Sequence, residues 1–123
     1  MKPIVLSFAF SFFYLLQADD TSSLLFNGNC ISCHKETKSV SAPSVLEFKK
    51  RYKDAFANKE NFVKQMSKWV SNPKEETSLM HDAIKKYGLM PHLCYELEML
   101  KDITSYIYDT NFTTRGGRYW KKN

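Results

Sequence analysis

Residues 30–34, Cys30-Ile31-Ser32-Cys33-His34, combine two thiols and an imidazole at a spacing that suits one chemical task. Two cysteines separated by two residues can form thioethers with the two vinyl groups of a single haem, and the histidine that follows can bind the iron from one face. With 3 Cys and 3 His in 123 residues, the pattern arises by chance in only about two of a thousand such sequences. The stretch therefore predicts one covalent haem, held by Cys30 and Cys33 with His34 as an iron ligand.

Two other kinds of site also use a Cys-x-x-Cys pair. A redox-active dithiol usually lies in a βαβ unit, and the sequence has no run of β-branched residues that alternates at period two. A zinc site needs a second group of ligands at matching spacing, whereas Cys94, His81 and His92 are not grouped in that way. Haem attachment is the interpretation that the spacing favours, with thiol chemistry or zinc as the alternatives.

Length and charge limit the remaining possibilities. A chain of 123 residues predicts one small domain with a thin core, for which a covalent haem would supply a large apolar surface. The net charge of +5 suits docking on redox partners with acidic surfaces, or on anionic membranes. Basic and acidic residues alternate through most of the chain, which argues against nucleic acid as a partner.

Residues 1–18 have the pattern of a signal peptide. Lys2 supplies the positive charge, and an uncharged apolar run follows over residues 4–16. This run is short for a transmembrane span, and Ala18 offers a cleavage point. Because Leu16 is a less usual residue near such a point, an uncleaved membrane anchor is the alternative. We expect a periplasmic protein, which fits haem attachment because bacteria carry out that attachment outside the cytoplasm.

Apolar residues recur at helical spacing in five segments, which predicts an all-α fold. Ser44 and Glu47 form a capping-box pattern, and Gly88 suits the end of a helix. The domain is predicted over residues 19–109, and residues 110–123 are predicted to form a flexible basic tail because they show no periodicity. The predicted helices run from Thr21 into the haem motif, from Val45 to Phe56, from about Lys59 to Ser71, from Pro73 to Tyr87, and from about Cys94 to Asp109.

The second axial position of the iron decides what such a haem does. A methionine sulfur raises the reduction potential, a second imidazole lowers it, and an open position invites small-ligand chemistry. Met90 lies in a predicted loop between two helices, and Pro91 stiffens the backbone behind it by fixing φ. We predict Met90 as the sixth ligand because a methionine in such a loop can reach across a haem face.

Other side chains compete for the same position. Met66 and Met99 lie on apolar helical stripes and are explained by packing. Met80 is the alternative sixth ligand if the helix predicted around it is interrupted. His81 and His92 are the remaining candidates.

With these features in place, residues 22–109 resemble a small class I cytochrome c, a monohaem family. Leu-Phe-Asn-Gly-Asn-Cys-Ile-Ser-Cys-His at 25–34 is similar to the first helix of that family, and Gly-Leu-Met-Pro at 88–91 resembles its methionine-ligand loop. Residues 103–107 resemble the part of the last helix that crosses the first, and Trp-Val-Ser-Asn-Pro at 69–73 is similar to the end of the middle helix. The resemblance implies a small helical domain wrapped around one covalent haem c.

The resemblance also implies a role for Pro43, whose carbonyl would orient the imidazole of His34. It implies an electron carrier, not an enzyme, that moves single electrons between periplasmic or membrane-bound complexes. Lys35, Lys85 and Lys86 are candidates for steering an acidic partner toward the haem edge. Two alternatives remain: a haem-based sensor or small peroxidase-like enzyme with a weak or absent sixth ligand, and a Cys-x-x-Cys thiol oxidoreductase.

Overall fold

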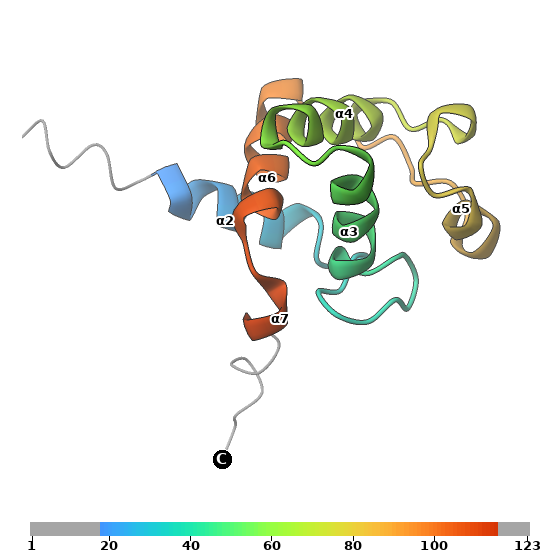
Figure 1. The fold of residues 1–123 in the computed structure, drawn as a ribbon, viewed down its shortest axis with the longest axis horizontal. Coiled ribbons are helices and arrows are strands. Elements are labelled where there is room, and N and C mark those ends of the chain that lie inside the picture. Colours follow the sequence, from blue (N-terminus) through green and yellow to red (C-terminus); the bar gives the residue numbers. More distant parts are fainter. Residues whose placement is uncertain (1–17, 116–123) are drawn as a thin grey trace, which may run out of the picture.

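The computed structural model of the protein describes residues 18–115. All regular secondary structure in this range is helical, which confirms the predicted all-α class (Figure 1). The predicted signal peptide lies outside the described residues except for Ala18, and within them no helix has the length and apolar character needed to cross a membrane. The elements are α2 (Ala18–Asn29), α3 (Val45–Ala55), α4 (Lys59–Ser71), the 3-10 helix η2 (Glu75–Thr77), α5 (His81–Tyr87), α6 (Leu97–Asp109) and α7 (Phe112–Arg115).

Helix α6 forms the centre of the fold, since it packs against α4 and crosses α2 (Figure 1). Its buried residues are Leu100, Ile103, Thr104 and Ile107, which recur at the three- and four-residue spacing of one helical face. At the crossing, the ring of Phe26 on α2 is fully buried and lies 5.4 Å from the ring of Tyr106. The helix before the haem motif and the helix that contains residues 103–107 therefore cross, as expected.

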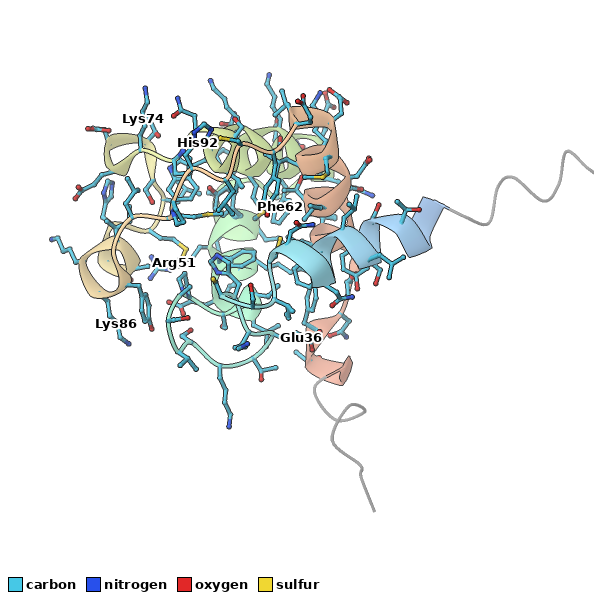
Figure 2. All side chains as sticks on the ribbon, turned by 180° about the vertical axis from the view of Figure 1, so that it is seen from behind. Glu36, Arg51, Phe62, Lys74, Lys86 and His92 are labelled. Carbon is cyan, nitrogen blue, oxygen red and sulfur yellow. The ribbon has the colours of Figure 1, made fainter. Side chains whose placement is uncertain are left out.

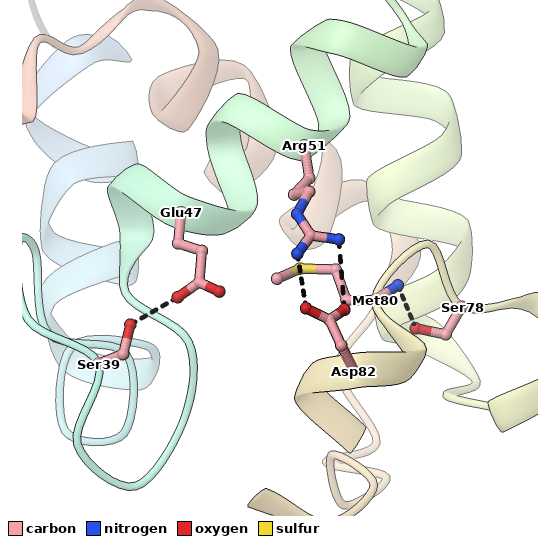
Figure 3. Close-up of polar contacts among 6 residues, drawn as sticks. All are labelled: Ser39, Glu47, Arg51, Ser78, Met80 and Asp82. Carbon is pink, nitrogen blue, oxygen red and sulfur yellow. Dashed lines mark hydrogen bonds and ion pairs between the residues drawn. The ribbon is translucent and has the colours of Figure 1, made fainter. Parts of the chain in front are cut away.

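The capping box of Ser44 and Glu47 at the start of α3 includes a third residue, Ser39, which connects the two. The Ser44 hydroxyl accepts a hydrogen bond from the Glu47 amide at 3.2 Å, as predicted. The Glu47 carboxylate accepts one from the hydroxyl of Ser39 at 2.6 Å (Figure 3). The Ser39 oxygen in turn accepts one from the Ser44 amide at 2.8 Å. The two orphan amides at the helix start are thereby paired.

The prediction of a single helix from Pro73 to Tyr87 is wrong. The chain forms the short turn η2, leaves helical geometry at residues 78–80, and starts a separate helix, α5, at His81. The Ser78 hydroxyl accepts a hydrogen bond from the amide of Met80 at 3.0 Å, a local side-chain bond that competes with helix continuation. Gly88 ends α5 with a φ of 86°, as its position predicted.

The last helix and the tail also depart from expectation. Helix α6 begins at Leu97, because Cys94 has a φ of 55°, in the left-handed region that an α-helix does not use. Phe112, which was placed in the flexible tail, is fully buried against the rings of Phe26 at 5.4 Å and Tyr106 at 6.2 Å. The packed domain therefore extends past Asp109, and residues 116–123 lie outside the described residues.

Candidate functional site

The Cys-x-x-Cys-His motif continues directly from α2 as one more helical turn. The amide of Cys30 donates to the carbonyl of Phe26 at 2.9 Å, and the amide of His34 donates to the carbonyl of Cys30 at 2.9 Å. The amide of Cys33 donates to the same Cys30 carbonyl at 3.3 Å. Residues three and four positions apart share one face of a helical turn. The backbone thus presents both thiols and the imidazole on the same side.

The imidazole of His34 is fixed in one tautomer. Its Nδ1 lies 2.8 Å from the carbonyl oxygen of Pro43, and because a carbonyl only accepts hydrogen bonds, Nδ1 carries the hydrogen. Burial lowers the pKa of His34, and the hydrogen bond to Pro43 opposes that shift only in part. The ring is therefore neutral at pH 7, with the lone pair on Nε2, which is the form that binds iron.

The loop between the motif and α3 holds this carbonyl in place. The amide of Val45 donates to the carbonyl of Lys35 at 2.9 Å, and the amide of Leu46 donates to that of Glu36 at 3.1 Å, so both ends of the loop are tied together. The ring of Phe48 on α3 packs edge-on against His34 with 5.2 Å between centroids. Pro43 was found through the resemblance. The contact with Phe48 was missed, because no local pattern connects that ring with the motif.

The Cys30 thiol lacks the lowered pKa that is typical of an attacking cysteine. Burial, together with the nearby Cys33, raises the pKa of Cys30 to about 11. Thiol oxidoreductases instead lower the pKa of the attacking cysteine, because the thiolate is the nucleophile. Cys30 is partly buried, Cys33 is exposed, and both are free thiols. This chemistry suits a thiol that is consumed once in thioether formation better than one that exchanges repeatedly.

A labelling experiment on the haem-free chain tests this difference. At pH 8, a thiol with a pKa of about 11 has about one hundredth of the thiolate fraction of a thiol whose pKa is 9.0, the usual value. We expect iodoacetamide to label Cys30 about 100-fold more slowly in the folded chain than in the same chain unfolded by urea, as followed by peptide mass spectrometry. Faster labelling of Cys30 in the folded chain would contradict this and restore thiol chemistry as the function.

The two methionine candidates for the sixth ligand both lie outside regular helix. Met80, with a relative exposure of 7%, is the cap residue before α5, so the interruption on which its candidacy depended is present. Met90 is half-buried in the irregular segment 89–96, in which no amide donates a backbone-to-backbone hydrogen bond to another described residue. Met66 is buried in the core and Met99 packs against that core, as predicted.

Several leucines on the segment around both methionines are exposed to solvent. They are Leu79, Leu89, Leu93 and Leu97, each 37% to 45% exposed. Exposed aliphatic surface of this kind favours association with an apolar partner. A haem that covers this part of the chain would remove it from water, so the residues present fit the group that the motif predicts.

Two of the other metal-ligand candidates lie together, since the Sγ of Cys94 is 3.8 Å from the Nδ1 of His92. His81 and His92 are both exposed. Among residues 18–115, no group of three or more His, Cys, Asp or Glu side chains is placed to hold a metal ion.

Exposed basic side chains lie on the segments that carry the predicted site residues. Lys35, Lys85 and Lys86 are all exposed, and Figure 2 shows Lys86 pointing outward from α5. Arg51 of α3 lies between α3 and α5 in the same view, where it forms an ion pair with Asp82. This pair was missed, since 31 positions separate its members and no local pattern connects them.

No protein-family model, curated protein or solved structure matches the chain. The function is therefore inferred from the chemistry of the site.

Proposed function

We propose that the protein is a periplasmic monohaem c-type cytochrome that carries single electrons between redox complexes. The observation that carries this proposal is the state of His34. Its Nδ1 donates to the Pro43 carbonyl at 2.8 Å, which leaves Nε2 free to bind a metal beside the two thiols of the same turn. A neutral imidazole fixed by a carbonyl in this way is the usual arrangement of a metal-binding histidine.

Each residue of the site has one task. Cys30 and Cys33 would hold the haem through thioethers, and His34 would bind its iron. Haem, when bound, supplies a reversible one-electron iron couple. Met90 would be the second iron ligand, with Met80 as the alternative. Met90 is preferred because Met80 is already packed and its amide is bonded to Ser78, whereas the backbone of segment 89–96 is free to adjust.

An electron carrier follows from this ligand set. A haem iron bound by both a histidine and a methionine would keep no open position for a substrate, so the chain would only have to bind the haem and exclude water. The fixed imidazole reduces reorganisation when the charge changes, because its orientation is already set by Pro43. Exposed Lys35, Lys85 and Lys86 would attract a redox partner with an acidic docking surface, an attraction that salt weakens.

An absorption spectrum of the exported protein tests the proposal against its two rivals. We expect a sharp α-band in the reduced protein that stays with the polypeptide after acid-acetone extraction, and slow binding of carbon monoxide. Rapid binding of carbon monoxide would instead indicate a sensor or a peroxidase-like enzyme with an open iron position. A colourless protein whose Cys30 and Cys33 react with thiol reagents would indicate a thiol oxidoreductase.

A further inference from the structure

Helix α5 is held in the fold by few contacts. The helix pairs that pack extensively within the described residues are formed among α2, α3, α4, α6 and α7, and α5 is in none of them. Ala83 is the buried residue of α5, and Met80 is buried just before it. The segment that carries both sixth-ligand candidates therefore needs another attachment to keep its position.

The ion pair between Arg51 and Asp82 supplies such an attachment. Nη2 of Arg51 lies 2.6 Å from one carboxylate oxygen of Asp82, and Nη1 lies 3.2 Å from the other (Figure 3). Two parallel bonds between a guanidinium and a carboxylate fix orientation as well as distance. Asp82 lies two residues after Met80 and in the first turn of α5, so the pair fixes the start of the helix that leads to Met90.

The α3 end of the Arg51–Asp82 pair lies close to the residue that packs against the His34 imidazole. Phe48 and Arg51 are three positions apart on α3 and therefore share a helical face. Phe48 packs against His34, and Arg51 bonds to Asp82. One face of α3 thus connects the histidine side of the site to the segment with the methionine candidates.

We propose that Arg51 and Asp82 form a clamp that positions the methionine segment against α3 and so keeps the sulfur ligand on the iron. This inference rests on the proposed haem function. Both are positioning residues that act through the ligand. The Arg51 and Asp82 side chains are 43% and 60% exposed, so water screens the pair and its effect is moderate.

Competition by imidazole in the haem-loaded protein measures the clamp directly, because imidazole binds the iron when the sulfur leaves. We expect Arg51→Gln and Asp82→Asn each to raise the affinity for imidazole about two- to fivefold. The double variant is expected to show the same rise as either single variant, because the two residues act as one pair. Asp54→Asn is the matched control: it breaks the exposed Lys50–Asp54 pair within α3 and should leave the affinity unchanged.

Hydrogen exchange of α5 gives a second measurement that does not need haem. The amides of Ile84 and Gly88 donate within α5 and at its end, so they report opening of this helix. They are expected to exchange two- to fivefold faster in both clamp variants. A change of this size matches the stabilisation that an exposed ion pair provides. Unchanged imidazole affinity and unchanged exchange in both variants would overturn the clamp. A wild-type chain without haem would contradict the proposed function, while the exchange comparison would still decide the clamp.

Discussion

The variant Cys30→Ala, Cys33→Ala is expected to emerge from export without any covalent haem. A thioether needs a cysteine sulfur, and these two side chains are the ones that the helical turn presents beside His34. The loss should be complete, because no other cysteine of the described chain lies in that turn. Haem-dependent staining of the polypeptide on a denaturing gel measures the result.

Cys94→Ala is the matched control for this double variant. Its side chain is exposed and lies beside His92, away from the motif in sequence, so its removal should leave the covalent haem unchanged. Covalent haem on the double variant, or its loss from the Cys94→Ala protein, would show that the motif at residues 30–34 has been misinterpreted.

Met90→Ala is expected to change the colour and the potential of the haem-loaded protein together. Loss of a sulfur ligand removes the weak red-region band of the oxidised protein. The reduction potential should fall by on the order of 0.2 V, because a thioether favours ferrous iron and water or hydroxide does not. A spectrum of the oxidised protein and a redox titration measure the two effects.

Met80→Ala is the companion variant, since both methionines lie outside regular helix and flank α5. We expect it to keep the red-region band and to lower only the stability, because a buried methionine side chain is lost. If the band disappears in Met80→Ala and survives in Met90→Ala, the assignment of the ligand is reversed. If the red-region band survives in both variants, neither methionine sulfur binds the iron.

The parts of the site that follow from local spacing could be predicted from sequence. The turn at residues 30–34 needs only bonds between positions four or fewer apart, so the motif itself contains its geometry. The capping box at Ser44 is local in the same way. The part played by Ser39 was missed, because it requires the loop before α3 to fold back and bring that hydroxyl to Glu47.

Features that depend on distant residues were not predictable. The run from Pro73 to Tyr87 has a helical pattern, and its interruption brings Met80 to a buried position that only the folded chain reveals. Phe112 looked like an isolated aromatic in a polar stretch, since its burial depends on Phe26, 86 positions earlier in the chain. Long-range pairing of this kind leaves no periodic signal in sequence.

The mass of the exported wild-type polypeptide tests the central claim most directly. After expression with a working haem-attachment system, denaturation and removal of free haem, the account predicts a mass equal to the processed polypeptide plus one haem. A mass equal to the polypeptide alone would contradict it, whatever the spectra of the undenatured protein show.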